Sequence, residues 1–309
     1  MDSLGFIGLG VMGLPMALNL RKTGHALCVF ARNPAQSATL QVAGATVLAS
    51  PFALAQTSEI LFINVTDDAA LEAVLFGRVD AITEATTEAT SDAIPGAAAG
   101  LRVGSIVVDM GTTSPTFTRQ VASRLAERGI DLIDAPVSGG EAGAIAGTLS
   151  IMAGGSEAAF QRVLPLFQVI GGSIVHVGDS GAGQVAKACN QIVASAALLG
   201  VAEALIFADH QGVDAAKVRQ ALLGGSAYSK ILEIHGQRML DRQFKPGFKA
   251  KLHQKDLGIV LAEAQQAGLA LPTAALAAQM MNALVGGGDG ELDSSALIQV
   301  IRKLNGEPT

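Results

Sequence analysis

Leu4-Gly5-Phe6-Ile7-Gly8-Leu9-Gly10-Val11-Met12-Gly13 is an apolar run that leads into a G-x-G-x-x-G pattern. Residues 4–7 predict a β-strand and residues 12–22 a helix. In this strand-turn-helix setting the first glycine permits a tight turn, the second lets the backbone approach a pyrophosphate, and the third allows close helix packing. The helix N-terminus adds amide donors and partial positive charge. The pattern predicts a dinucleotide site formed by Gly8, Leu9, Gly10, Val11, Met12 and Gly13, with a purely structural turn as the alternative.

The next segments alternate between strand and helix patterns. Further strands are predicted at 26–30, 60–65, 106–109 and 130–134, and helices begin at Asn33-Pro34, at Thr66 or Asp67, and at Ser114-Pro115. Such alternation indicates a Rossmann-type, doubly wound α/β fold with a mainly parallel sheet.

After about residue 177 the pattern becomes helical only. Ala- and Leu-rich helices are predicted at 183–211, 214–223, 255–267, 273–285 and 294–303. We therefore expect a dinucleotide-binding Rossmann domain at 1–177 and an all-helical substrate and dimerisation domain at 178–309. The connecting helix would be about 43 Å long, more than one small domain can cover. A homodimer or homotetramer is expected.

Composition narrows the class of protein. The chain of 309 residues is 50% apolar with a net charge of -6, which excludes a disordered chain and argues against a nucleic-acid partner. Two cysteines, Cys28 and Cys189, are too few for a disulfide framework and are expected to be core thiols; the five histidines are scattered, so no metal site is expected. The apolar run 192–202 is too short to span a bilayer. A cytoplasmic protein without a membrane partner is expected.

The end of the second predicted strand bears on the choice of cofactor. An NAD site usually has an acid there to bind the ribose 2′-OH, whereas this chain has Ala31-Arg32-Asn33. Arg32 can pair with a 2′-phosphate, which favours NADP over NAD. A solvated Arg32, or one that stacks on adenine in an enzyme using both cofactors, is the alternative.

Two other segments carry substrate chemistry. Ser138-Gly139-Gly140 follows the predicted strand at 130–134, and its hydroxyl and uncovered amides suit a carboxylate, although an ordinary glycine turn is equally compatible. Lys187 and Asn190 are three residues apart on one helix face. A lysine in apolar surroundings beside a cationic nicotinamide has a lowered pKa and can exchange a proton near neutral pH. The alternative is a lysine that extends to solvent.

Two segments are harder to interpret. The 248–257 stretch holds four cationic or imidazole groups, which could face a phosphate-bearing cofactor or form a solvated basic face. The 77–104 segment is either an extra surface helix or a loop, and no chemistry is evident in it.

Several motifs occur in one order along the chain: Gly5 to Gly13 followed by Pro15-Met16, Asp109-Met110 with Ser114-Pro115, Asp134 to Gly140, Gly181-x-Gly183-x-x-x-Lys187-x-x-Asn190, and Lys255-Asp256-Leu257. Together they resemble the β-hydroxyacid dehydrogenase family, which includes the 3-hydroxyisobutyrate dehydrogenase-like proteins. The stretches 134–150 and 244–257 are most similar to its 2-hydroxy-3-oxopropionate (tartronate semialdehyde) reductase branch.

This resemblance implies an NAD(P)-dependent oxidoreductase that acts on the CH–OH group of a short 3-hydroxy acid or on its semialdehyde. It implies Lys187 as the acid/base, Ser138, Gly139 and Gly140 as the carboxylate site, and Asn190 as a substrate contact. Cofactor contacts are implied for Val65, Thr112 and Lys255 and added to those of Arg32 and Asn33. The alternatives are a 3-hydroxyisobutyrate or related hydroxyacid dehydrogenase, an imine or aldehyde reductase, and a non-catalytic nucleotide-binding module. An intact Lys187 argues against an imine reductase and against a non-catalytic module.

Overall fold

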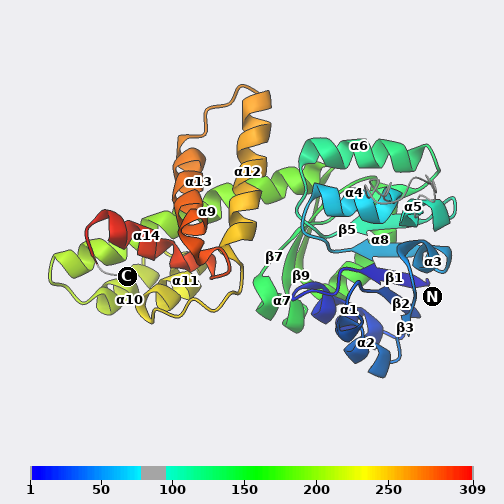
Figure 1. Ribbon diagram of the computed structural model, residues 1–309, viewed down its shortest axis with the longest axis horizontal. Helices are drawn as coiled ribbons and strands as arrows, with labels where there is room; N and C mark the ends of the chain where they lie inside the picture. Colours follow the sequence, from blue (N-terminus) through cyan, green and yellow to red (C-terminus); the bar gives the residue numbers. More distant parts are fainter. Residues whose placement is uncertain (1, 78–94, 308–309) are drawn as a thin grey trace, which may run out of the picture. The chain divides into compact units, whose positions relative to one another are not determined.

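The computed structural model describes residues 2–77 and 95–307 (Figure 1). The chain divides into two compact units, Met1–Lys187 and Ala188–Thr309. The first contains the sheet and the second is helical, so the predicted Rossmann-type fold followed by an all-α region is confirmed. Helix α9 (Ala182–His210) crosses the boundary between them as one continuous element of 29 residues.

A nine-stranded, mainly parallel sheet forms the centre of the first unit. Its order is β3-β2-β1-β4-β5-β6-β8-β7, with β9 paired to β8. The strands are β1 (Leu4–Ile7), β2 (Leu27–Phe30), β3 (Thr46–Val47), β4 (Ile60–Ile63), β5 (Ile106–Asp109), β6 (Asp131–Asp134), β7 (Val137–Ser138), β8 (Leu149–Gly154) and β9 (Gly171–Gly178). Strand β1 pairs with β2 on one side and β4 on the other, so the sheet order reverses there. Ligands of such sheets bind beyond the carboxyl ends of the strands at this reversal.

Alternating side chains of the central strands bury both faces of the sheet. In β4, for example, Ile60 and Phe62 join one hydrophobic cluster, whereas Leu61 and Ile63 join the other. The first cluster is covered by α1 (Gly13–Lys22), α2 (Ala38–Val42), α7 (Gly140–Ala146) and α8 (Glu157–Ile170) (Figure 1). The second is covered by α3 (Pro51–Gln56), α4 (Asp68–Phe76), α5 (Ala97–Gly100) and α6 (Pro115–Ala126).

The second unit packs its helices around the apolar side of α9. Its further helices are α10 (Ala215–Leu223), α11 (Lys230–Leu240), α12 (Ala250–Gln266), α13 (Pro272–Leu284) and α14 (Leu297–Leu304), with short turns η2 (Val285–Asp289) and η3 (Ser294–Ala296). Their shared core includes Leu198, Leu205, Leu257, Met281 and Leu297.

Local signals located the five central strands and the starts of several helices. Of the two candidates Thr66 and Asp67, Asp67 caps α4 through its side chain, and Ser114 caps α6 at the predicted helix start. Asn33-Pro34 does begin a helical segment, but it is the short 3₁₀ turn η1 (Pro34–Gln36). The sequence pattern did not identify β3, β7, β8, β9, α3, α5, α7, α8 or α11, and it placed the start of α12 at residue 255 rather than 250. Strands β7, β8 and β9 lie at the irregular side of the sheet, where β8 runs antiparallel to β6 and β7. The Thr83 to Asp92 part of the 77–104 segment lies outside the described residues.

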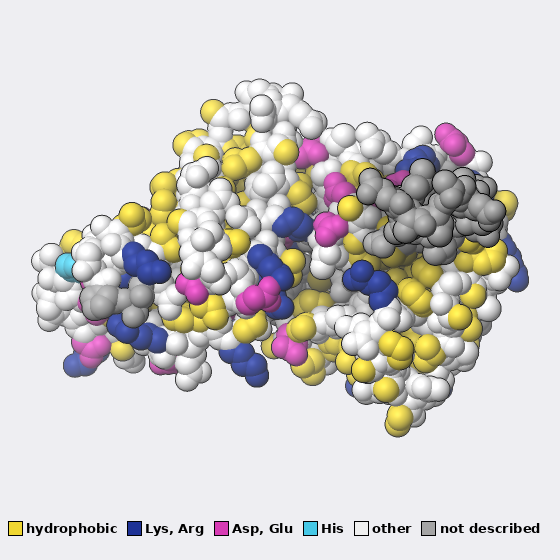
Figure 2. Space-filling view, in the orientation of Figure 1, with side chains coloured by type: hydrophobic (Ala, Val, Ile, Leu, Met, Phe, Trp, Pro, Cys, Tyr) yellow, Lys and Arg dark blue, Asp and Glu magenta, His cyan; other side chains and the backbone are white. Residues whose placement is uncertain are grey.

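Three surface features bear on the expectations from composition. Cys189 is exposed rather than a core thiol, because its position on α9 faces away from the apolar side, while Cys28 is half-buried. On the face shown in Figure 2, basic and acidic side chains are interspersed. Helix α9 is long and apolar enough to cross a membrane by length and composition, so the 11-residue run understated its apolar extent. Half of its most hydrophobic window is buried inside the protein.

Candidate active site

The glycine loop lies at the carboxyl end of β1, where the sheet order reverses. Gly8 has a φ of 96°, and a Cβ there would clash with the carbonyl oxygen of Asn64. No protein atom lies within 4 Å of the position a Cβ would take on Gly10, so its backbone is open to a ligand. Met12 offers no side-chain cap to the start of α1. The loop therefore fits a pyrophosphate, with an open backbone and a helix N-terminus whose amides no capping side chain occupies.

The predicted cofactor residues of neighbouring strands lie along the same edge of the sheet. Arg32 is exposed beyond β2, whereas the Asn33 side chain accepts a 3.1 Å hydrogen bond from the Ala35 amide and caps η1. The Asn33 side chain is thus used locally. Val65 and Thr112 are half-buried in the loops after β4 and β5. These loops touch, since a Cβ on Gly111 would lie 2.5 Å from the Val65 carbonyl oxygen.

The predicted carboxylate turn connects β7 to α7. Ser138 pairs with Ser150 across the antiparallel β7–β8 ladder, which fixes the direction in which the turn leaves the sheet. Gly139 and Gly140 have φ values of 135° and 62°, in the region that favours glycine. Ser138 and Gly140 are half-buried and Gly139 is exposed, so the turn can be reached by a ligand.

Lys187 lies beside this turn. Its side chain extends from the second turn of α9, is only 7% exposed, and donates a 2.8 Å hydrogen bond from Nζ to the Val137 carbonyl oxygen. Val137 immediately precedes Ser138, so the structure brings the ammonium to the backbone that forms the carboxylate turn. An ammonium in this position can pass a proton to an oxygen bound at the turn.

A buried carboxylate of the Asp134 to Gly140 motif, to which the sequence analysis assigned no role, holds the start of α9. Asp134, at the end of β6, is fully buried and accepts hydrogen bonds from the Gly181 amide (2.7 Å) and the Gln184 amide (2.9 Å). Burial raises the pKa of Asp134 to about 6, and the backbone hydrogen bonds offset only part of this effect. The sequence signal that could have indicated this role is a charged residue, Asp134, at the end of a strand that is otherwise apolar there.

Gln184 connects this helix start to the loop after β5. The side-chain NH₂ of Gln184 donates to the Gly111 carbonyl oxygen (3.0 Å), and its side-chain oxygen accepts from the Thr113 backbone amide (3.2 Å). The Thr113 hydroxyl in turn donates to the Asp109 carboxylate at 3.1 Å. Gln184 is 1% exposed, so these buried bonds hold the Thr112 loop and the helix that carries Lys187 in one arrangement.

In the helical unit, Asn190 and Lys255 are joined by two residues that the sequence reading had not assigned to the site. Asn190 donates to Gln191, Gln191 donates to Asp256, and Asp256 forms an ion pair with Lys255. Gln191 and Asp256 are 4% and 3% exposed. The predicted substrate amide and the predicted cofactor lysine thus belong to one buried polar chain.

The start of α12 is held by another buried carboxylate, Asp293. It accepts from Arg238 (2.6 Å) and from the amides of Gly247 (2.9 Å) and Phe248 (3.1 Å). Burial raises the pKa of Asp293, but hydrogen bonds from His235, Ser295 and the backbone outweigh it and hold the pKa well below its usual range.

The basic stretch at 248–257 does not act as one surface. Lys249 and Lys251 both pair with the exposed Glu291, His253 is buried, and Lys255 pairs with Asp256. Only Lys255 in this stretch is connected to Asn190 by the bonds described above.

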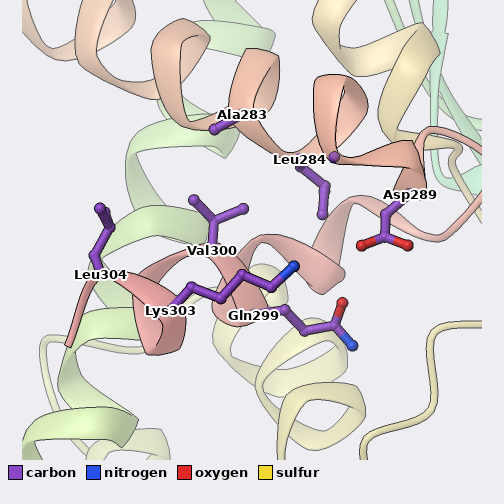
Figure 3. A pocket seen from close by; sticks show the side chains of 8 residues that line it. Ala283, Leu284, Asp289, Gln299, Val300, Lys303 and Leu304 are labelled. Carbon is purple, nitrogen blue, oxygen red and sulfur yellow. The ribbon is translucent and has the colours of Figure 1, made fainter. Parts of the chain in front are cut away.

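A pocket in the helical unit lies apart from the predicted site residues. A pocket of about 310 Å³ in the helical unit is lined by α13, η2 and α14, including Asp289, Gln299 and Lys303 (Figure 3). None of the predicted site residues lines it. Among residues 2–77 and 95–307, no three His, Cys, Asp or Glu side chains are grouped so that they could hold a metal ion.

Comparison with known proteins places the whole chain. Residues 3–178 match the family described as the NAD binding domain of 6-phosphogluconate dehydrogenase, and residues 181–301 match the NAD-binding region of NADP-dependent 3-hydroxyisobutyrate dehydrogenase. The chain is 45% identical over 298 residues to 2-hydroxy-3-oxopropionate reductase of Escherichia coli (strain K12), covering 96% of each chain. It is 40% identical to a probable 3-hydroxyisobutyrate dehydrogenase-like 1 protein of Arabidopsis thaliana, covering 98% of this chain and 86% of the relative.

Solved structures agree. The fold matches that of 3-hydroxyisobutyrate dehydrogenase from Salmonella typhimurium with a TM-score of 0.83, 28% identity, and coverage of 97% and 100% of the two chains. It also matches Psf3 in complex with NADP+ and 2-OPP, with a TM-score of 0.84, 25% identity, and coverage of 96% and 99%. The chain therefore belongs to the 3-hydroxyisobutyrate dehydrogenase-like family and is an NAD(P)-dependent hydroxyacid dehydrogenase acting on the CH–OH group of its substrates.

Proposed function

We propose that the protein is a 2-hydroxy-3-oxopropionate reductase, which converts tartronate semialdehyde to glycerate with NADPH. Support comes from the identity with the Escherichia coli enzyme of that name and from the position of Lys187 beside the Ser138-Gly139-Gly140 turn. The nearly buried Lys187 Nζ, 2.8 Å from the Val137 carbonyl oxygen, is the observation that carries the assignment of the acid/base.

Three parts of the chain divide the work of binding. The substrate carboxylate binds the Ser138 hydroxyl and the amides of Gly139 and Gly140. The pyrophosphate of the cofactor lies on the loop from Gly8 to Gly13, with Arg32, Val65, Thr112 and Lys255 as further contacts. We also propose Asn190 as a contact of the substrate.

The chemical step needs one proton and one hydride. When bound, the reduced cofactor supplies the hydride to the aldehyde carbon. Lys187 donates its proton to the carbonyl oxygen, so that the aldehyde becomes a primary alcohol, and in the reverse direction it takes the hydroxyl proton. The ammonium also stabilises negative charge that develops on this oxygen in the transition state.

The setting that we propose for the enzyme follows from its surface and its cysteines. Cys28 and Cys189 are both free thiols, which suits the reducing cytoplasm. We propose a homodimer or homotetramer, since α9 carries exposed apolar side chains such as Val193 (69%) and Phe207 (67%).

A substrate panel tests the assignment. Tartronate semialdehyde, 3-hydroxyisobutyrate, glyoxylate, succinic semialdehyde, L-threonate and serine are compared with NADPH or NADP+ and with NADH or NAD+. Tartronate semialdehyde should have the highest kcat/KM by at least about tenfold, the discrimination that one polar substrate group commonly provides. A clear preference for 3-hydroxyisobutyrate or serine would replace the proposed substrate and leave the reaction class unchanged.

A further inference from the structure

A buried chain of polar side chains in the helical unit ends at Asn190. The Asn190 Nδ2 donates to Gln191 Oε1 at 2.8 Å, and Gln191 Nε2 donates to Asp256 Oδ2 at 2.6 Å. The other Asp256 oxygen, Oδ1, lies 3.0 Å from Lys255 Nζ. Because Gln191 and Asp256 are almost fully buried, each bond that they form replaces one that water would otherwise supply.

The chemistry of these groups fixes the direction of the chain. An ionised carboxylate has no hydrogen to donate, so Asp256 can only accept from Gln191. Gln191 must therefore turn its NH₂ toward Asp256 and its carbonyl oxygen toward Asn190. Asn190 must in turn donate from Nδ2, which leaves Oδ1 on the other branch of its amide. The buried charge of Asp256 thus decides that the Asn190 amide turns Nδ2 toward Gln191 and Oδ1 away from it.

We propose that Gln191 and Asp256 are positioning residues that fix the Asn190 amide, so that its carbonyl oxygen accepts a hydrogen bond from a hydroxyl of the substrate. The inference rests on the proposed function, in which Asn190 contacts substrate. In the proposed function, Lys187 donates its proton to the reacting carbonyl oxygen, and the Ser138-Gly139-Gly140 turn binds the substrate carboxylate. The polar group of a 2-hydroxy-3-oxopropionate that remains is its 2-hydroxyl, which can donate to Asn190 Oδ1. A substrate with a methyl group at that carbon offers no donor.

Exchanging the charge along the chain tests this direction. In Asp256→Asn, Lys255 attracts the new carbonyl oxygen, so the new NH₂ faces Gln191. Gln191 and Asn190 then reverse, and Asn190 presents NH₂ to the substrate. In the double variant Asp256→Asn/Gln191→Glu, the new carboxylate at position 191 accepts from Asn190 and from the new amide at position 256. Nδ2 of Asn190 therefore faces position 191 again, as in the wild type. Both variants lack the Lys255–Asp256 ion pair, so comparing them removes any effect of that pair on cofactor binding.

The readout is the ratio of kcat/KM for tartronate semialdehyde to that for methylmalonate semialdehyde, which has a methyl in place of the hydroxyl. Asp256→Asn should lower this ratio about 2- to 10-fold, because the hydroxyl oxygen can still accept from the new NH₂ while the hydroxyl hydrogen loses its acceptor, and the double variant should recover most of the loss. If Asp256 had a merely structural role, Asp256→Asn would lower kcat/KM for both substrates by the same factor. Equal losses for both substrates, or a double variant no better than the single one, would overturn the proposal.

A matched control removes a hydrogen bond between α12, which carries Asp256, and α13. Gln254 on α12 donates to Asn282 at 2.8 Å in an exposed amide pair that lacks a carboxylate. Asn282→Leu removes that hydrogen bond and should leave the ratio unchanged. If the ratio falls as in Asp256→Asn, altered packing of α12 is responsible and the proposal is wrong.

Neutron diffraction from deuterated wild-type crystals gives a second readout that needs neither folding of a variant nor activity. We expect two deuterons on the Asn190 atom that faces Gln191. An oxygen at that position contradicts the proposal whatever the enzyme turns over. Absence of wild-type turnover on every substrate of the panel would instead count against the proposed function, so the two failures are distinguishable.

Discussion

The Lys187 ammonium donates a 2.8 Å hydrogen bond to the carbonyl oxygen of Val137, 50 residues earlier in the chain. This bond joins the second turn of α9 to the strand that leads into the Ser138-Gly139-Gly140 turn. Asp134 accepts from two amides at the start of the same helix, so strand end, turn and lysine are held together by buried hydrogen bonds. A proton donor placed by such bonds keeps its position without depending on a mobile loop.

Replacing Lys187 tests its role in proton transfer. Lys187→Ala should lower kcat by about 10² to 10⁴-fold, the usual contribution of a general acid/base, while the protein stays folded. Lys187→Arg is the matched control, since it keeps the charge but cannot release a proton near neutral pH, and it should lose comparable activity. The measurements are kcat on the best substrate, NADPH affinity by fluorescence, and the melting temperature. Near-normal kcat in Lys187→Ala would show that another group transfers the proton.

The Ser138-Gly139-Gly140 turn should recognise a carboxylate. In Gly139→Val a side chain must adopt a φ of 135° and would approach Leu149, whose Cδ2 lies 3.2 Å from the new Cβ position. We expect KM for the acid substrate to rise about tenfold or more, because the loss of one charge-assisted hydrogen bond weakens binding by about that factor. The affinity for NADPH should change little. Wild-type kinetics on the acid and on its uncharged amide provide the comparison, and equal kcat/KM for the two would remove this assignment.

Asp134 should make stability depend on pH in a defined window. Its pKa is raised to about 6 in the folded protein from an ordinary value of 3.8, so the folded state binds the proton more tightly than the unfolded state. The resulting stabilisation is complete below about pH 4 and is lost as the pH rises through about 6. A shift of this size corresponds to roughly 3 kcal/mol.

Urea denaturation of the wild type and of Asp134→Asn at pH 4, 5, 6 and 7 measures this effect. Subtraction of the two free energies of unfolding cancels the titration of other carboxylates. The difference, wild type minus variant, should fall as the pH rises from 4 to 7. A difference that is flat over this range means that Asp134 titrates normally.

Cofactor preference is the next prediction. No acid follows β2, and the exposed Arg32 can pair with a 2′-phosphate, so NADPH should bind about 10- to 100-fold more tightly than NADH. Ala31→Asp should reverse the preference, because the new carboxylate accepts from the ribose 2′-OH and repels the phosphate. The values of kcat/KM for both cofactors in both proteins decide the point. A wild type that prefers NADH would contradict our interpretation of this strand end.

Oligomerisation should depend on the exposed side of α9. Val193, Gly200 and Phe207 recur every seven residues on one helix face, and no protein atom approaches the position of a Cβ on Gly200. We expect a dimer or tetramer at micromolar concentration, and Phe207→Arg should shift it toward the monomer by burying a charge in the contact. Light scattering on both proteins measures the mass. A monomeric wild type would contradict the prediction.

The sequence by itself determined much of this protein, wherever the information is local. The glycines after β1, the caps at Asp67 and Ser114, and the helical repeat of α9 each act within a few residues, so the pattern located them. Lys187 and Asn190 were found in the same way, because their spacing on one helix is itself local.

Tertiary structure alone decided how these residues are held. Asp134 reaches amides about 47 to 50 residues away, Gln184 reaches Gly111 across 73 residues, and Gln191 reaches Asp256 across 65. Neither a propensity nor a spacing rule identifies such partners. A buried polar group must find its hydrogen bonds wherever the packed chain offers them, and only the packing of the sheet edge and helices shows which atoms those are.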